Sequence, residues 1–378
     1  MSRRGNGEGS LSHRPDGRWQ AQVTVEGRRR VAYGRTREDA AAELQRLQHT
    51  VTVGLPVTPE RLTVGAFTRR WLEGARPHLA PSTATRYAQL VAEQIIPTWG
   101  RLRLSKLSPD DVSAGLANLQ AGGLSPRSCS HVRAVLRTAL NDGLRKGTVP
   151  RNVASLSSPP RVPYQRPKLL SPGEVQAVLD ALDDPTMRRM VTVALATGLR
   201  QGELLGLRWE DVADGQVRVA YALQRVAGRY ELVRPKSDSS KRSIPLTPDA
   251  VAALEDQRQA QRLAQLAAGG RWRPVIPNLC FTLAAGQPVN GPALTHRFEA
   301  ALARAGLPVI RWRHLRHAFA GLMLASGVEL ATVSHLLGHS DVSLTASTYA
   351  GIAPSLRQDA TNRLGALLQR PGGSQPAT

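Results

Sequence analysis

The 378-residue sequence predicts a multidomain, mainly α protein with a small ββ(β)α module first, a helical domain second and a mixed α+β domain last. The chain is longer than one ordinary domain, so two or three domains are expected. Two stretches rich in proline and glycine, residues 50–62 and 157–167, interrupt the periodic segments where linkers are expected. Hydrophobic residues make up 41% of the chain, which is enough for packed cores and indicates a globular protein.

The N-terminal module is assigned to residues 1–55. Between residues 17 and 35, polar and apolar residues alternate on both sides of a turn at Glu26-Gly27, which predicts two or three short strands. Thr36 then begins a helix. The apolar face of this helix is formed by Ala40, Ala41, Leu44 and Leu47.

Three consecutive arginines, Arg28, Arg29 and Arg30, lie on an expected strand of this module. Positive charge on an exposed edge strand protects a sheet against aggregation, and that role needs no ligand. Alternatively, a three-stranded sheet can lie in a DNA groove, where arginines contact phosphates and bases. We expect these arginines to bind DNA.

Residues 62–156 are expected to be helical throughout. Each segment opens at Ser, Thr or a residue beside proline and closes at Gly or Pro, as helices usually do. The expected helices are Val64–Ala75, Ser82–Ile96, Ser108–Gln120 and Ser125–Lys146. Basic side chains on them suit contact with a phosphate backbone, and the candidates for DNA binding are Arg86, Arg127 and Arg133.

Residues 157–167 form an extended linker, and residues 168–355 form the largest domain. This domain begins at a capping box, Ser171–Glu174, and continues with an apolar helix. The apolar helix is Met187–Thr197, strands are expected at Val217–Leu223, Tyr230–Val233 and Lys241–Leu246, and the rest is expected to be helical to Ala346. A tail, residues 356–378, follows and begins with apolar residues at helical spacing.

The chain is strongly basic, with a net charge of +21 and an isoelectric point near 11.3. Such charge is extreme for an enzyme of small metabolites and favours a polyanionic partner. Only five of the 50 basic residues are lysines. Arginine is the side chain better suited to bidentate phosphate contacts, although a GC-rich genome also raises its share.

Other classes of protein are disfavoured. Cys129 and Cys280 lie in different regions without the spacing of a zinc site or a disulfide framework, so no metal or cofactor is expected. The N-terminus has no apolar segment of signal-peptide type, and the apolar run Met190–Leu199 is too short to cross a bilayer. We therefore expect a cytoplasmic protein without membrane contact.

Cleavage of a phosphodiester without a metal needs a nucleophile, cations for the non-bridging oxygens and a proton donor for the leaving 5′ oxygen. The last domain offers each kind of residue. Arg200 follows Gly198 at the junction of two expected helices, and Lys236 lies in a turn between two strands. The other candidates are Arg313, Arg316, His339 and Tyr349, with Glu203 and His314 in supporting positions.

These segments resemble the conserved boxes of the tyrosine recombinases, the phage-integrase family. The stretch Thr197-Gly198-Leu199-Arg200 with Glu203-Leu204 is similar to the first box, Arg313–His317 to the second and Leu336–His339 to the third. The resemblance is strongest over residues 168–355, weaker over 63–156, where it implies a helical core-binding domain, and faint over 1–55, which is similar to an arm-binding module. The implied last domain is a mixed α+β tyrosine-recombinase catalytic domain.

The resemblance implies a role for each candidate. Tyr349, ten positions after His339, is implied as the nucleophile, and Lys236 matches the family's mobile hairpin lysine, the general acid for the 5′ oxygen. Arg200, Arg316 and His339 are implied to contact the scissile phosphate, with Glu203 behind them.

The second box departs from the family pattern, because Arg313 stands where histidine is usual. An arginine can donate hydrogen bonds to a phosphate oxygen, but it does not shuttle protons at neutral pH. His314 is the neighbouring alternative, although helical geometry turns it by about 100°. We expect Arg313 to be a phosphate donor that ranks below Arg316.

The implied function is site-specific recombination through a 3′-phosphotyrosine intermediate, which integrates or excises a mobile element. The implied partners are double-stranded attachment sites, a tetramer of the chain on DNA and an accessory directionality factor. From its apolar helical spacing alone, the tail, residues 356–378, is expected to dock onto a neighbouring protomer. Three alternatives stay open: an inactive DNA-binding regulator, which Arg313 favours, a type IB topoisomerase, and a general nucleic-acid-binding protein, which would need the charge but not Tyr349.

Overall fold

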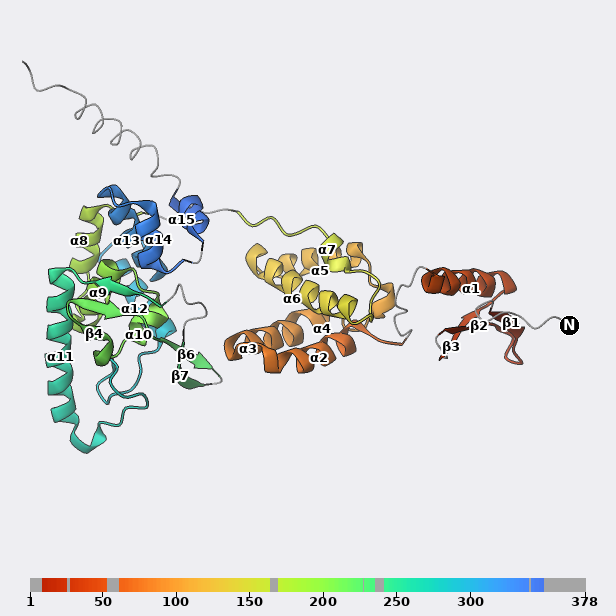
Figure 1. Cartoon of the computed structure of the whole chain (residues 1–378), viewed down its shortest axis with the longest axis horizontal. Helices are drawn as coiled ribbons and strands as arrows, with labels where there is room; N and C mark the ends of the chain where they lie inside the picture. Colours follow the sequence, from red (N-terminus) through yellow and green to blue (C-terminus); the bar gives the residue numbers. More distant parts are fainter. Residues whose placement is uncertain are drawn as a thin grey trace, which may run out of the picture. The chain divides into compact units, whose positions relative to one another are not determined.

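The structure, a computed structural model, describes residues 9–25, 28–52, 61–163, 169–226, 228–234, 241–339 and 341–349. The chain divides into two compact units between Tyr164 and Gln165 (Figure 1). This boundary lies inside the stretch 157–167, which the sequence marks as a linker.

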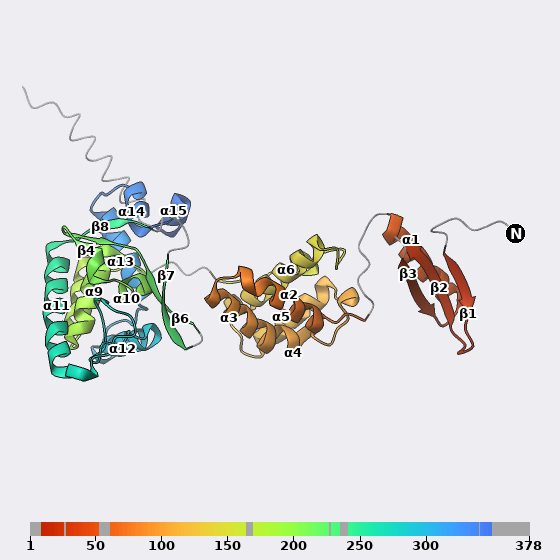
Figure 2. The ribbon, with the colours of Figure 1, turned by 60° about the horizontal axis from the view of Figure 1, so that its bottom comes forward.

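The first unit begins with an antiparallel sheet in the order β1-β2-β3, and one helix packs against β2 and β3 (Figure 2). The elements are β1 (Ser10–His13), β2 (Trp19–Val25), β3 (Arg28–Gly34) and α1 (Arg37–Thr52). Ala21, Ala32 and Ala40 form the core between them. The first strand lies before residue 17, outside the range in which strands were expected, because its polar sequence shows little alternation.

Helices make up the rest of this unit. They are α2 (Val64–Ala75), α3 (Pro81–Leu90), α4 (Ile96–Trp99), α5 (Pro109–Ala121), α6 (Pro126–Arg145) and α7 (Val153–Leu156). The expected helix Ser82–Ile96 continues to Trp99 through a π-helical turn, Val91–Ile95. Pro97 removes one backbone donor, and the wider turn ahead of it accommodates that loss.

The second unit mixes helices with short strands. Its helices are α8 (Pro172–Asp180), α9 (Pro185–Thr197), α10 (Gln201–Leu205), α11 (Pro248–Ala268), α12 (Gly291–Arg304), α13 (Arg313–Ala325), α14 (Leu330–Leu337) and α15 (Val342–Tyr349). Its strands are β4 (Val212–Ala213), β5 (Gln216–Arg218), β6 (Ala222–Val226), β7 (Arg229–Val233) and β8 (Ser243–Pro245). The expected capping box at Ser171 is present and opens α8.

Two expectations for this unit were wrong in detail. The single expected strand Val217–Leu223 is two strands in different sheets, because β5 pairs with β4 and β8 whereas β6 pairs with β7. Residues 272–290 are not helical: they form an irregular segment held by isolated bridges such as Thr282 to Pro288. Three prolines in it, Pro274, Pro277 and Pro288, disfavour a helix.

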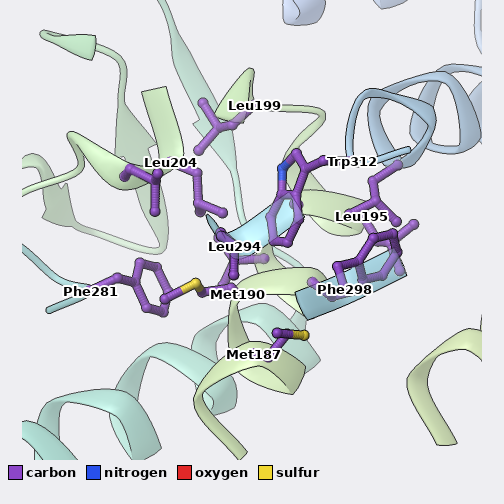
Figure 3. Close-up of a cluster of buried hydrophobic side chains, with 14 of the residues drawn as sticks. Met187, Met190, Leu195, Leu199, Leu204, Phe281, Leu294, Phe298 and Trp312 are labelled. Carbon is purple, nitrogen blue, oxygen red and sulfur yellow. The ribbon is translucent and has the colours of Figure 1, made fainter. Parts of the chain in front are cut away.

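Helix α9 contributes to the centre of the core of this unit. Figure 3 shows Met187 and Met190 of α9 among aromatic side chains from later segments. Phe298 of α12 meets the indole of Trp312 edge to face, with the ring centroids 5.5 Å apart. Because Trp312 is buried, the residues that follow it at the start of α13 are held at the edge of the core.

Candidate active site of the C-terminal unit

Arg200 is fixed by a sharp junction between α9 and α10. Helix α9 ends at Gly198, whose φ of 63° is left-handed and whose missing Cβ leaves room for the Phe319 ring. Arg200 is the N-cap of α10, and its backbone N–H donates to the Glu203 carboxylate at 2.9 Å. One guanidinium nitrogen, Nη1, donates to Glu203 Oε1 at 2.7 Å. The Arg200 side chain is nevertheless 44% exposed, so it can also reach a ligand.

Arg316 lies on α13 and contacts two helix ends. Its Nη1 donates to the Gly198 carbonyl at 2.8 Å, and its Nη2 donates to the Leu337 carbonyl. These bonds satisfy carbonyls that have no partner inside their own helices. Arg316 thus joins the end of α9 to the end of α14.

Three arginines together cap the C-terminal end of α14. The carbonyls of Leu336, Leu337 and Gly338 accept hydrogen bonds from Arg242, Arg316 and Arg200, respectively. The last carbonyls of a helix carry a partial negative charge, which favours cations at this end. We call this arrangement the three-arginine cap; it fixes the turn that carries His339.

Arg242 was not among the residues expected from the sequence. Its side chain is completely buried, and it donates to Glu203 Oε2 at 3.0 Å. The sequence held a signal for its burial, because residues two positions apart in a strand lie on the same face and Arg242 lies two positions before the apolar Ile244. In the structure Arg242 and Ile244 are buried, and Lys241 and Ser243 are exposed. The sequence could not show which carboxylate pairs with it.

Gly338 brings the cap close to the buried guanidinium. Its φ is 65°, and a Cβ at this position would lie 2.8 Å from Arg242 Nη1. We therefore expect Gly338→Ala to cost about 1–2 kcal/mol of unfolding free energy for the left-handed backbone and more for the clash. Denaturant unfolding measures this. The control is Gly306→Ala, which has a φ of 67° and no neighbour within 4 Å; equal losses in both variants would contradict the close packing.

His339 follows directly after the cap, and its backbone N–H donates to the Ser334 carbonyl at 3.1 Å. Burial lowers the pKa of His339 to about 4, and the positive charges of Arg316, Arg200 and Arg242 act in the same direction. The imidazole is therefore neutral at pH 7. A neutral imidazole can donate a ring N–H to a phosphate oxygen.

The start of α13 holds two of the expected residues. His314 accepts the backbone N–H of Arg311 at Nδ1, at 3.2 Å, while its own backbone N–H donates to the Arg311 carbonyl at 2.8 Å. This reciprocal cap occupies Nδ1 of His314 and leaves Nε2 as the ring donor. Arg313, the first residue of α13, is exposed. The structure thus favours Arg313 over His314 as the residue of this box that is available to a ligand.

The structure describes one expected residue only in part and another not at all. Lys236 lies outside the described residues. Tyr349 is the last residue of α15, and its backbone alone is described. Helix α15 packs beside α14, the helix that bears the three-arginine cap (Figure 1).

The low pKa values in this region predict acid sensitivity. Burial, aided by neighbouring histidines and arginines, also lowers the pKa of half-buried His317 to about 4, against 6.5 for an ordinary histidine. Between these two values the unfolded chain binds more protons than the folded chain, so stability falls as the pH drops from about 6.5 to about 4.

Thermal unfolding at pH 7.5 and at pH 5 tests this. The melting temperature of the unmodified chain should fall more between the two pH values than that of His317→Gln. His335→Gln, at an exposed position of α14, is the control and should behave like the unmodified chain. An unchanged pH dependence in His317→Gln would contradict the proposed burial effect.

Comparison with known proteins decides the family. The model of the phage integrase family matches residues 168–355, and the model of its N-terminal SAM-like domain matches residues 63–116. An integrase of Streptomyces ambofaciens is 31% identical over 363 residues, which cover 92% of this chain and 93% of the relative. The chain belongs to the phage integrase family. It is therefore a tyrosine-type enzyme of site-specific DNA recombination.

Other relatives agree. A XerC-like tyrosine recombinase of Caldanaerobacter subterraneus subsp. tengcongensis is 27% identical and is matched over 91% of its length, and over 89% of this chain. Among solved structures, the Tn1549 transposon integrase in complex with transposon right end DNA has a TM-score of 0.70 at 19% identity, covering 80% of this chain and all of that chain. A lambda integrase tetramer bound to a Holliday junction has a TM-score of 0.58 at 17% identity. The match covers 92% of this chain and 96% of the lambda integrase chain. These structures share the fold.

The arginines expected to bind DNA in the first unit have different surroundings. Arg29, Arg86 and Arg127 are exposed, and of these Arg29 donates to Gln22 and Arg86 donates to Gln89 at 2.7 Å. The side chains of Arg28 and Arg30 lie outside the described part of the chain.

No described helix is long and apolar enough to cross a membrane.

Arg133 has a structural role in this integrase. Its Nε donates to Ser157 Oγ at 3.0 Å, and its Nη2 donates to the Ser157 carbonyl at 2.6 Å. These bonds hold Ser157, the first residue of the expected linker, on α6. DNA binding by Arg133 stays a prediction that this arrangement does not favour, because two of its donors are already used.

Proposed function

We propose that this integrase cuts and rejoins double-stranded DNA at attachment sites of a mobile element through a 3′-phosphotyrosine intermediate. The observation that supports the proposal is the three-arginine cap. In it the partly exposed Arg200 donates to the carbonyl of Gly338, the residue before the neutral His339, and the capped helix α14 packs beside α15, the helix of Tyr349. Cations and neutral donors are the groups that stabilise a phosphorane.

In the first step, the Tyr349 oxygen attacks the scissile phosphorus, and the bond from phosphorus to the 5′ oxygen breaks. The phenol releases its proton to solvent, and Lys236 donates one proton to the leaving oxygen and is then reprotonated by solvent. In the second step, the 5′-hydroxyl of a partner strand attacks the phosphotyrosine and releases the phenol. One phosphoester replaces another in each step, so the bond energy is conserved and no ATP is consumed.

Arg200 and Arg316 stabilise the negative charge of the phosphorane. Each guanidinium has five N–H donors, and the cap and Glu203 engage two guanidinium nitrogens of Arg200. Further N–H donors of Arg200 are proposed to bind the non-bridging oxygens. Arg313 is exposed at the start of α13 and is the third cationic donor. His339 donates its ring N–H.

We assign the partner as DNA on two grounds. The chain has a charge of +21, and related integrases of the same fold are solved with DNA: the Tn1549 enzyme with transposon DNA and the lambda enzyme as a tetramer on a Holliday junction. Exchange between two duplexes needs four cleavages, so we propose a tetramer of this chain on DNA. An accessory directionality factor is a further proposed partner.

The remaining domains are proposed to bind and arrange the DNA. The sheet module, residues 1–55, is proposed to bind arm-type sites, with Arg29 on an exposed strand position. The helical domain, residues 62–156, is proposed to bind the core site with exposed arginines such as Arg86 and Arg127. The tail, residues 356–378, lies outside the described residues and is proposed to dock onto a neighbouring protomer.

A covalent selection tests the proposed chemistry and identifies the cleaved sequence in the same experiment. The full chain is incubated in EDTA with nicked duplexes that contain a randomised core, and SDS-resistant adducts are recovered, amplified and sequenced. We expect enrichment of one family of sequences joined to the protein through a 3′ phosphate. Salt-sensitive binding without any adduct would contradict the proposal and favour the non-catalytic regulator, for which Arg313 is the supporting observation. Relaxation of supercoiled DNA without strand exchange would favour a topoisomerase.

A further inference from the structure

Arg242 lies under the proposed active site and cannot reach the DNA. Its side chain has no exposed surface, so any effect on the reaction must pass through the residues that it contacts. Among the described residues, its side chain donates to Glu203 of α10 and to the Leu336 carbonyl of α14. A single buried guanidinium thus connects the start of β8 with α10 and α14.

Glu203 is the link from Arg242 to Arg200. Its Oε1 accepts from Arg200 Nη1 at 2.7 Å, and its Oε2 accepts from the Arg200 backbone at 2.9 Å and from Arg242 Nη2 at 3.0 Å. Burial raises the pKa of Glu203, but the two guanidinium groups outweigh this and lower it overall, so the carboxylate is charged. Since the Arg200 side chain is 44% exposed, Arg242 is the buried counter-ion.

The cap is the second link, from Arg242 to His339. Arg242 Nε donates to the Leu336 carbonyl, and the guanidinium packs against the Cα of Gly338, where even a methyl group would clash. His339 is the next residue, and the Gly338 carbonyl accepts from Arg200. Displacement of Arg242 would therefore move the turn that positions His339 and the acceptor that holds Arg200.

We infer that Arg242 is a positioning residue for recombination: it holds Glu203 and the end of α14, and so orients Arg200 and His339 toward the scissile phosphate. This inference rests on the proposed function. Without Arg242, the charged Glu203 would lose its buried counter-ion, and a buried charge that lacks its partner is strongly unfavourable. Arg200 is the only other cation bonded to Glu203 among the described residues, and it would turn further toward the carboxylate, away from the DNA.

The test separates positioning from stability and from DNA binding. Arg242→Gln, Arg242→Lys and the unmodified chain are compared on a nicked duplex recovered by the covalent selection. Three quantities are measured for each: the single-turnover cleavage rate, the dissociation constant for the duplex and the melting temperature. The control is Arg189→Gln, which removes a half-buried arginine that bonds Gln257 and Thr186 elsewhere in the same unit.

We expect Arg242→Gln to slow cleavage by about 100-fold and to change the dissociation constant by less than about threefold, because Arg242 does not reach the DNA. Arg242→Lys keeps the positive charge beside Glu203, so it should recover part of the cleavage rate. The recovery should be incomplete, because one ammonium group replaces the planar set of donors of the guanidinium. Arg189→Gln should lower the melting temperature but leave the cleavage rate nearly unchanged.

Several results would overturn the inference while the proposed function stands. The first two are a normal cleavage rate in Arg242→Gln, and a loss of DNA affinity in Arg242→Gln as large as its loss of cleavage rate. The other two are a cleavage rate in Arg242→Lys no higher than in Arg242→Gln, and a cleavage rate in Arg189→Gln as low as in Arg242→Gln when the two variants have similar melting temperatures. A separate result concerns the function itself: if the unmodified chain forms no adduct, the proposed function fails, and the inference fails with it.

Discussion

Tyr349→Phe should form no covalent adduct with the selected duplex, a loss of at least about 10³-fold in cleavage. The phenol oxygen is the proposed attacking atom, and phenylalanine keeps the ring but removes that atom. Binding to the duplex should be retained, because the arginines that contact phosphate are unchanged. Adduct formation on SDS gels and binding by fluorescence anisotropy measure the two effects.

Tyr221→Phe is the matched control. Tyr221 belongs to the same unit, and its ring lies 4.4 Å from the guanidinium carbon of Arg208, so it is a tyrosine with a packing role. Phenylalanine keeps that ring, and the adduct should form at nearly the normal rate. Persistence of the adduct in Tyr349→Phe would show that another residue is the nucleophile, and peptide mapping of the adduct would identify it.

Arg200→Lys should lower the cleavage rate by about 10²- to 10³-fold. Arg200 donates at once to Glu203 and to the Gly338 carbonyl, and its remaining donors are proposed to bind the phosphate. Lysine has a single ammonium group and cannot serve three acceptors in a fixed plane. Since part of the positive charge is kept, the loss of DNA affinity should be much smaller than the loss of rate.

Arg188→Lys is the control for this variant. Arg188 is exposed on α9 and faces Asp180 at 3.8 Å, an arrangement that contributes little. Its cleavage rate should match that of the unmodified chain. If Arg200→Lys cleaved as fast as the unmodified chain, the planar guanidinium at this position would have no role in the reaction. The assignment of Arg200 to the phosphate would then be wrong.

Arg200 and Arg242 illustrate two uses of the same side chain on one carboxylate. Both donate to Glu203, but Arg200 is 44% exposed and Arg242 has no exposed surface. Exposure allows Arg200 to meet a phosphate directly, and burial restricts Arg242 to holding its neighbours. A variant of either residue should slow cleavage, but only for Arg200 is direct contact with the substrate the reason.

Much of the secondary structure was predictable because it depends on neighbours in the sequence. The capping box at Ser171 and the helix Val64–Ala75 are confirmed as expected, since caps join residues only three positions apart. The strands around residue 220 were not predictable in detail. β5 pairs with the distant strand β8 whereas β6 pairs with its neighbour β7, and alternation alone does not specify which partner each segment takes.

By itself, the sequence determined the family and the residue types of the candidate site, because short motifs such as Thr197–Arg200 and Leu337–His339 are local. The tertiary structure alone decided that Arg242, Arg316 and Arg200 cap successive carbonyls of one helix end, that Nδ1 of His314 caps α13, and that Arg133 holds the linker. Except for the local cap of His314, these bonds join residues far apart in the chain. A buried polar group must find a partner, and which partner it finds is set by packing rather than by spacing along the sequence.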